Sequence, residues 1–157
     1  MATPYVAVVG AGGAVAAELL ADAEAVGAEL ARRGAVLVCG GLGGVMEAAC
    51  RGARAEGGTT LGILPGEDRA AANPWVSVAV ATGLGELRNG LVVRSADAVI
   101  AIAGGYGTLS EIALALKAGM RVVGLRSWEI GGVLAVDDPA AAVELALGVD
   151  PARGRGI

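Results

Sequence analysis

The chain has 157 residues, of which 55% are hydrophobic and 18% charged, and its formal net charge is −4. That length fits one domain with a real core, and no apolar run reaches the roughly 18 residues that would cross a bilayer. The first residues lack the basic stretch and apolar run of a secretory signal, so we expect a soluble, cytoplasmic protein without a membrane partner.

The residue types that are rare in this chain exclude several kinds of function. There is no His, which removes every Ser-His triad and the commonest metal ligand, so we predict neither a metal site nor a bound cofactor. The 12 Lys and Arg residues are scattered and only four residues are aromatic, which disfavours a nucleic-acid partner. Cys39 and Cys50 have no neighbouring His or second Cys pair, and we interpret them as small buried hydrophobic residues.

The first half of the chain alternates short apolar runs with longer amphipathic segments. Residues 5–9 form a Val-rich strand, and apolar residues then recur at helical spacing over 15–30. The same unit repeats as a strand at 36–39 and a helix at 45–55, followed by a strand at 60–64. Many of the 27 glycines follow these apolar runs, which is typical of tight turns between strands and helices.

The middle of the chain is less regular. Residues 67–74 carry charges, Asn and Pro without periodicity and predict a loop that could cover a ligand. Residues 75–81 alternate like a strand, and 84–94 have helical spacing with Leu87, Leu91 and Val92 predicted to face inward.

The last third returns to the strand-and-helix alternation. We predict strands at 98–102 and 122–125 on either side of a helix at 109–118, then a weak strand at 133–136. Asp138 followed by Pro139 predicts an N-cap and first-turn proline for a final helix.

This order predicts an α/β protein with a three-layer Rossmann-like fold, a mainly parallel sheet with helices on both faces. We expect residues 1–150 to form a single nucleotide- or phosphate-binding domain and 151–157 a flexible C-terminal tail. In such a sheet, ligands bind beyond the carboxyl ends of the strands, where the glycine clusters also fall.

The first two glycine clusters are weak signals of ligand binding. Gly10 and Gly12 form a G-x-G after the first strand, but Val15 stands where a dinucleotide fingerprint needs Gly or Ala, and no acidic residue ends the second strand. The first loop therefore either lines a ligand or serves as a packing turn. The second cluster lets the backbone approach a ligand and opens a helix whose N–H groups could hold an anion; it comprises Gly40, Gly41, Gly43 and Gly44.

The segment AGGYGTLSE, from Ala103 to Glu111, is the strongest motif. It predicts a phosphate-binding turn between a buried strand and a helix, formed by Gly104, Gly105, Tyr106, Gly107 and Thr108. No Lys follows the last glycine, so the turn is not a Walker loop. Thr108 and Glu111 also match a capping box, in which Glu111 would only close on the backbone of an N-cap Thr108. Arg88 and Asn89 lie in the preceding predicted helix, where most arginines are solvated surface groups.

The stretch LRNGLVVRSADAVIAIAGGYGTLSEIALALKAG, together with CGGLGGVMEAA, resembles the Lonely Guy (LOG) family, once labelled "possible lysine decarboxylase". The resemblance is closest to the bacterial branch related to molybdenum cofactor carrier proteins. LOG enzymes hydrolyse the N-glycosidic bond of nucleoside 5′-monophosphates, releasing the base and ribose 5-phosphate. The resemblance implies that Arg88 and Glu111 are catalytic and that the glycine turn holds the 5′-phosphate. A lysine decarboxylase is excluded, because the sole lysine, Lys117, sits late in a helix without a site around it.

Two departures keep the function open. LOG enzymes usually carry Arg-Lys where this chain has Arg88-Asn89, and Pro where it has Ala103, and the Asn version is similar to the carrier branch. The leading hypothesis is a phosphoribohydrolase; the alternatives are a carrier of a phosphorylated pterin cofactor and a nucleotide-sensing module. The family resemblance also implies a homo-oligomer, a dimer or a tetramer, and the apolar last strand and helix are consistent with self-association.

Overall fold

A computed structural model describes residues 2–148 and contains one sheet of seven parallel strands. The order across the sheet is β4-β3-β2-β1-β5-β6-β7. The strands are β1 (Tyr5–Gly10), β2 (Val36–Cys39), β3 (Thr60–Leu64), β4 (Val78–Ala81), β5 (Ala98–Ile102), β6 (Arg121–Leu125) and β7 (Val133–Val136). The predicted Rossmann-like α/β fold is therefore confirmed.

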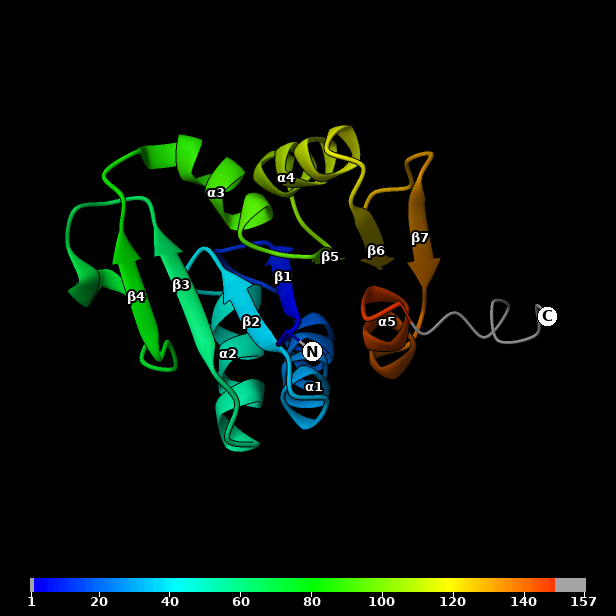
Figure 1. The fold of residues 1–157 in the computed structure, drawn as a ribbon, viewed down its shortest axis with the longest axis horizontal. Helices are drawn as coiled ribbons and strands as arrows, with labels where there is room; N and C mark the ends of the chain where they lie inside the picture. The colour runs from blue at the N-terminus through cyan, green and yellow to red at the C-terminus, as the bar shows by residue number, and fades with distance from the viewer. Residues whose placement is uncertain (1, 149–157) are drawn as a thin grey trace.

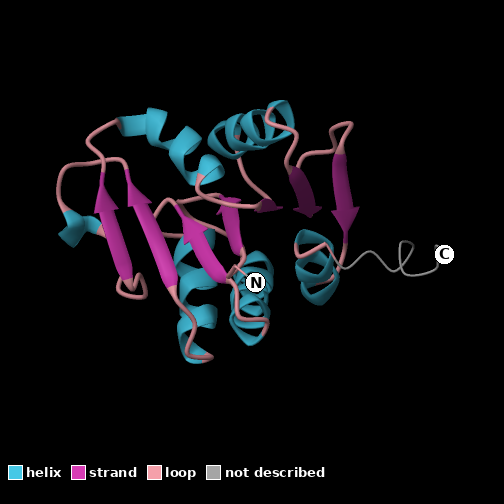
Figure 2. Cartoon of the chain, in the orientation of Figure 1, coloured by secondary structure: helices cyan, strands magenta, loops and turns pink. Residues whose placement is uncertain are grey.

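Five α-helices cover the two faces of this sheet (Figures 1 and 2). They are α1 (Ala17–Arg32), α2 (Val45–Ala55), α3 (Arg88–Arg94), α4 (Tyr106–Lys117) and α5 (Pro139–Ala146). Helices α1, α2 and α5 lie on one face, while α3 and α4 pack together on the other. Two short 3₁₀ turns, η1 (Arg69–Ala71) and η2 (Gly85–Leu87), lie in the connections. Within residues 2–148, no helix has the length and apolar character needed to cross a membrane.

Strand β1 lies at the centre of the sheet and supplies core residues to both faces. Val6 and Val8 belong to the apolar cluster beneath α1, α2 and α5, whereas Ala7 and Val9 belong to the cluster beneath α3 and α4. Strand β1 pairs with β2 on one side and with β5 on the other. The strand order reverses at β1, because β2 lies on one side of it and β5 on the other. Helix α2, which follows β2, and helix α4, which follows β5, lie on opposite faces of the sheet. A crevice consequently opens at the carboxyl end of β1, where such folds bind ligands.

Most predicted elements are present, with shifts at their ends. The N-cap of the last helix is confirmed, since the Asp138 carboxylate accepts a hydrogen bond from the N–H of Ala141 at 2.9 Å. Cys39 and Cys50 are buried and not joined by a disulfide, and their sulfurs share a hydrogen bond at 3.5 Å. The predicted tail, 151–157, lies outside the described residues.

Two sequence predictions about helices are wrong. Helix α4 begins at Tyr106 with Gly105 as its N-cap, so Thr108 lies inside the first turn and is not the N-cap. Of the three residues predicted to face inward, Val92 is buried, but Leu87 and Leu91 are exposed, because the segment splits into η2 and the short α3, which turn these two side chains to the surface. Apolar spacing alone could not tell a core-facing stripe from an exposed one.

Candidate functional site

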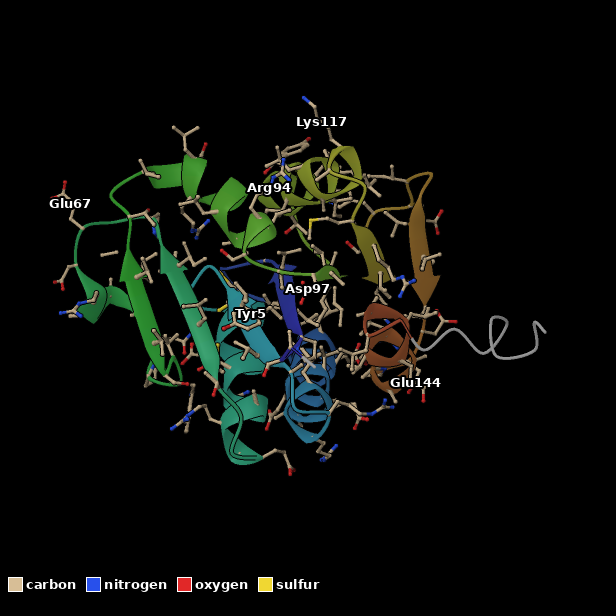
Figure 3. All side chains as sticks on the ribbon, viewed as in Figure 1. Tyr5, Glu67, Arg94, Asp97, Lys117 and Glu144 are labelled. Carbon is tan, nitrogen blue, oxygen red and sulfur yellow. The ribbon has the colours of Figure 1, made fainter. Side chains whose placement is uncertain are left out.

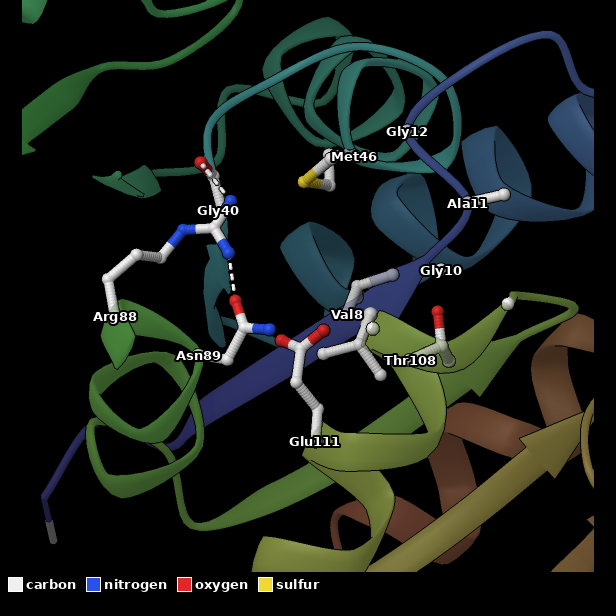
Figure 4. A pocket seen from close by; sticks show the side chains of 13 residues that line it. Val8, Gly10, Ala11, Gly12, Gly40, Met46, Arg88, Asn89, Thr108 and Glu111 are labelled. Atoms are coloured by element: carbon white, nitrogen blue, oxygen red, sulfur yellow. Dashed lines mark hydrogen bonds between the residues drawn. The ribbon is translucent and has the colours of Figure 1, made fainter. Parts of the chain in front are cut away.

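A cavity of about 340 Å³ opens at the carboxyl ends of β1, β2 and β5 (Figure 4). We call it the main cavity. It is lined by three residues of β1, glycine-rich turns and the N-terminal parts of three helices: Val8, Val9, Gly10, Ala11, Gly12, Gly40, Met46, Arg88, Asn89, Gly105, Gly107, Thr108 and Glu111. Its position is the reversal point of the sheet, where the fold predicts a ligand.

The turn after β1 forms one wall of the main cavity and is fixed by close packing. A Cβ on Gly10 would lie 2.6 Å from the carbonyl oxygen of Ile102, so only glycine fits where β1, β5 and α2 converge. The N–H of Val45, the first residue of α2, donates to the carbonyl of Ala11 at 2.9 Å. One of the N–H groups at the start of α2 is therefore used by the protein itself, which leaves this helix terminus less available to an anion.

The turn before α4 forms the opposite wall and is held in an unusual backbone conformation. Ala103 has φ 48° and Gly104 has φ 106°, which redirects the chain from β5 into α4. A Cβ on Gly104 would lie 2.3 Å from the hydroxyl oxygen of Thr108, so this turn also requires glycine. Gly105, Gly107 and Thr108 line the main cavity at the helix N-terminus, where backbone N–H groups without partners in the helix and the helix dipole favour a bound anion.

A loop after β6 clamps this turn from outside the cavity. The Ser127 hydroxyl donates to the carbonyl of Ala103 at 2.7 Å, and the Trp128 indole N–H donates to the carbonyl of Gly105 at 3.2 Å. The Trp128 ring also packs beside that of Tyr106, with 6.2 Å between the ring centroids. The turn is thus pre-arranged before any ligand arrives, which lowers the entropic cost of binding.

Glu111 projects from the second turn of α4 into the main cavity and is only 8% exposed. The capping-box interpretation is wrong, because the helix starts at Tyr106 and no side chain caps it. Among the described residues, none donates a hydrogen bond to the Glu111 carboxylate. Burial raises the pKa of Glu111 to about 7, although the positive charge of Arg88 opposes part of that rise.

Arg88 lies at the first position of α3 and is almost completely buried. Its Nε donates to the carbonyl of Ile63 at 2.9 Å, and one terminal nitrogen donates to the carbonyl of Gly40 at 3.5 Å. The other terminal nitrogen donates to the side-chain oxygen of Asn89. Figure 4 shows Asn89 between Arg88 and Glu111, with its amide nitrogen on the side of the carboxylate. The surface-arginine alternative is therefore wrong for Arg88.

The structure brings most of the predicted site residues to one place. Nine of them line the main cavity, namely Gly10, Gly12, Gly40, Arg88, Asn89, Gly105, Gly107, Thr108 and Glu111. The other five lie outside its lining. Gly41 packs on Leu64, and Gly43 and Gly44 pack against the turn after β1. Gly104 lines the hollow beside Trp128, and Tyr106 faces the groove between α3 and α4. Sequence reasoning missed Val8, Val9, Ala11 and Met46, which also line the cavity. Ala11 could have been found between the two glycines of the first turn, whereas Met46 resembles any core residue of α2.

This arrangement joins a fixed positive charge, a helix N-terminus and a carboxylate that can exchange a proton near neutral pH. The first two favour an anionic group such as a phosphate. The third can take up or release a proton as the ligand binds or reacts. The site is therefore suited to a phosphorylated small molecule.

Comparison with proteins of known structure shows close similarity over nearly the whole chain. A molybdenum cofactor binding protein from the phototrophic bacterium Rippkaea orientalis is 36% identical, with a TM-score of 0.88 over 95% of this chain and 98% of that one. The molybdenum cofactor carrier protein of Chlamydomonas reinhardtii is 34% identical, with a TM-score of 0.83 over 93% of this chain and 99% of that one. A comparison of sequences also finds a relative, an uncharacterized protein of Archaeoglobus fulgidus. It is 45% identical over 119 residues, which are 75% of this chain and 78% of that protein.

The sequence pattern of a protein family covers almost all of the described residues. It matches residues 3–147, a range that contains every strand and helix of the fold. The resemblance read from the glycine motifs is confirmed by this match and by the carrier structures. The chain belongs to the SLOG cluster4 family.

Proposed function

We propose that this chain binds a phosphorylated small molecule in the main cavity and that its ligand is the molybdenum cofactor, held as cargo. The observation that carries the proposal is the pairing of the α4 N-terminus with the buried guanidinium of Arg88 across one cavity. The similarity to cofactor binding and carrier proteins over at least 93% of this chain supports the choice of cargo. The carrier hypothesis therefore takes first place, ahead of the phosphoribohydrolase hypothesis that the sequence alone favoured.

In this proposal the phosphate lies against the start of α4. The N–H groups of Gly105, Gly107 and Thr108 and the Thr108 hydroxyl donate to its oxygens. Hydrogen bonds to two protein carbonyls hold the Arg88 guanidinium in place. Arg88 therefore contributes a fixed positive charge rather than a side chain that moves to bind the phosphate with two hydrogen bonds. Asn89 has its side-chain oxygen occupied by Arg88, which leaves its amide N–H groups to donate to the ligand. At about 340 Å³ the main cavity lies within the roughly 300–1,000 Å³ typical of small-molecule sites.

Glu111 makes the binding of an anion depend on pH. An ionised carboxylate in the same cavity repels a phosphate, whereas the protonated acid can donate a hydrogen bond to it. Since the pKa of Glu111 is about 7, the affinity for an anionic ligand should rise as the pH falls from 8 to 6. If binding requires the acid form, affinity changes by up to about tenfold for each pH unit above the pKa. Glu111→Gln should lose the part of this pH dependence that comes from the carboxylate and keep only the part that comes from the phosphate, whose second pKa is about 6.

The direct test is binding of molybdenum cofactor released from a molybdoenzyme. Protein is incubated with the released cofactor under anaerobic conditions and washed by ultrafiltration, and the retained pterin fluorescence and molybdenum are measured. We expect retention by the natural chain and loss in the double variant Asn89→Ala/Thr108→Val. The matched control, Ser95→Ala, changes an exposed residue outside the main cavity and should retain the cofactor. Equal retention by the double variant, or none by the natural chain, would refute the proposal.

A second function is supported by the presence of Arg88 and Glu111 in the same cavity. A carboxylate with a pKa near 7 can position and deprotonate water and stabilise the positive charge that builds on ribose as an N-glycosidic bond breaks. The chain would then hydrolyse a nucleoside 5′-monophosphate to the base and ribose 5-phosphate. The assay is release of free base from AMP, CMP and GMP at high protein concentration, with Glu111→Gln as the inactive variant. Base release that survives Glu111→Gln would remove Glu111 from the mechanism, and no release at all would leave only the binding function.

A further inference from the structure

Two thiols lie buried together behind one wall of the main cavity. Cys39 ends β2 and Cys50 lies in the second turn of α2, and neither side chain reaches the surface. Their sulfurs share a hydrogen bond at 3.5 Å. A disulfide requires sulfurs about 2.05 Å apart, so the two atoms need to approach by only about 1.5 Å to bond. The chain has no other cysteine, so each of these thiols has one possible partner within the molecule.

The surroundings of the pair make its two sulfurs chemically different. The hydrogen bond from Cys39 lowers the pKa of Cys50, whereas burial raises it. The neighbouring side chains of Asn73 and Thr60 add to the lowering of the Cys50 pKa. The hydrogen bond with Cys50 and burial together raise the pKa of Cys39 well above its ordinary value. Since the thiolate is the nucleophile in thiol oxidation, Cys50 is the sulfur that reacts first and Cys39 is the resolving thiol.

A route from solvent to Cys50 passes beside Asn73. This residue lies in the connection between β3 and β4 and is partly exposed, and Figure 3 shows the Glu67 side chain at the start of the same connection pointing away from the fold. The N–H of Asn73 donates to the carbonyl of Gly41 at 2.9 Å, and its side-chain amide donates to the carbonyl of Leu42 at 2.9 Å. Because Asn73 lies next to both solvent and Cys50, a brief release of these two hydrogen bonds gives a small oxidant access to the sulfur.

We propose that Cys39 and Cys50 are a modification site, at which a small peroxide converts the two thiols into a reversible disulfide. The Cys50 thiolate attacks one oxygen of hydrogen peroxide and the O–O bond breaks, which leaves a sulfenic acid on Cys50 and a hydroxide that takes up the proton lost by the thiol. The Cys39 sulfur then attacks the Cys50 sulfur, the S–O bond breaks, and a second water leaves with the Cys39 proton. The two thiols lose two electrons in all, the peroxide is reduced to two waters, and a dithiol reductant reverses the change.

The position of Cys39 links this modification site to the main cavity. The N–H of Gly41 donates to the Cys39 sulfur at 3.3 Å, and the carbonyl of the intervening Gly40 accepts a hydrogen bond from the Arg88 guanidinium at 3.5 Å. Closure of the disulfide draws the Cys39 sulfur toward α2 and away from the Gly41 N–H, which disturbs the turn that carries the Gly40 carbonyl. The disulfide should therefore weaken the hold on Arg88 and lower the affinity of the cavity for an anion, an effect that rests on the proposed function.

The first experiment counts free thiols after oxidation and does not involve the cavity. Reduced protein is treated with hydrogen peroxide, denatured, labelled with N-ethylmaleimide and measured by intact mass spectrometry. We expect the natural chain to lose both labelled thiols together, without a cross-link between chains, and to recover both after treatment with dithiothreitol. Two labelled thiols after peroxide, a disulfide only between chains, or a loss that dithiothreitol does not restore would each overturn the proposal.

The matched variants Cys39→Ala and Cys50→Ala separate the roles of the two sulfurs. Cys39→Ala keeps the reactive thiol beside Asn73 and Thr60 but removes its partner, so it should accumulate a sulfenic acid that dimedone traps. Cys50→Ala should be trapped at least about tenfold less, with unchanged circular dichroism in both variants. Equal trapping of the two variants, or stronger trapping of Cys50→Ala, contradicts the assignment of Cys50 as the sulfur that reacts first.

The last experiment compares the binding of inorganic phosphate to the reduced and the oxidised natural chain by titration calorimetry. We expect several-fold weaker binding to the oxidised chain, restored by dithiothreitol, and no effect of peroxide on Cys39→Ala/Cys50→Ala. This double variant also separates the disulfide from oxidation of Met46, which lines the main cavity. Equal affinity of the two forms refutes the link to Arg88. If neither form binds phosphate, the proposed function fails, and the thiol count by itself decides whether the disulfide forms.

Discussion

The buried carboxylate of Glu111 should lower the stability of the protein in a pH-dependent manner that Glu111→Gln removes. In the folded chain its pKa is about 7 against an ordinary value of 4.5. Below pH 4.5 the acid is protonated in both the folded and the unfolded chain and has no differential effect. Above pH 7 it is ionised in both, and the folded chain carries the cost of a buried charge.

The size of the effect follows from these two pKa values. They differ by about 2.5 pH units, and each unit corresponds to about 1.4 kcal/mol, so the full cost is roughly 3–4 kcal/mol. Linkage gives a cost near zero at pH 4, about 1 kcal/mol at pH 5.5 and about 3 kcal/mol at pH 8. Glu111→Gln, which keeps the shape and removes the charge, should therefore gain stability over the natural chain as pH rises.

The assay is urea unfolding of both proteins at several pH values, in buffers free of phosphate and sulfate because a bound anion would add its own stabilisation. Any pH-independent effect of the amide cancels when differences at two pH values are compared. Glu129→Gln is the matched control at an exposed carboxylate and should stay within about 0.5 kcal/mol of the natural chain. If the stability gained by Glu111→Gln is the same at pH 5 and pH 8, the carboxylate is not buried as described.

Three further substitutions test the walls of the site and the fold. Gly104→Ala should cost at least about 1–3 kcal/mol in urea unfolding, since its Cβ meets Thr108 at a positive φ, whereas Gly105→Ala has open space and should cost less. Arg88→Met leaves two buried carbonyl oxygens without their donor and should lower stability by about 1–3 kcal/mol per lost partner; an unchanged melting temperature would contradict the burial of Arg88. Asp138→Ala removes the N-cap of α5 and should cost about 1 kcal/mol, whereas Asp138→Asn should cost less; equal losses would argue against a capping role.

The local pattern of the chain determined its elements and the end of the sheet at which a ligand could bind. Runs such as VAVV and AVIAI are continuous and apolar because parallel strands are covered on both faces, and glycines follow them where the chain must turn sharply. From these two features the Rossmann-like order, and the meeting of the Gly10 and Gly105 turns, could be predicted. Arg88 and Glu111 could be selected only through the family resemblance, because spacing alone favoured a surface arginine and a capping glutamate.

The tertiary structure decided the environment of those residues. Glu111 lacks a capping role because α4 starts at Tyr106, and its raised pKa arises from burial by elements distant in sequence. Leu87 and Leu91 have the spacing of a core helix, yet they face outward because α3 packs on α4 through its other side. Periodicity records which residues share a face of a helix, whereas the neighbours of that face depend on the order of the strands.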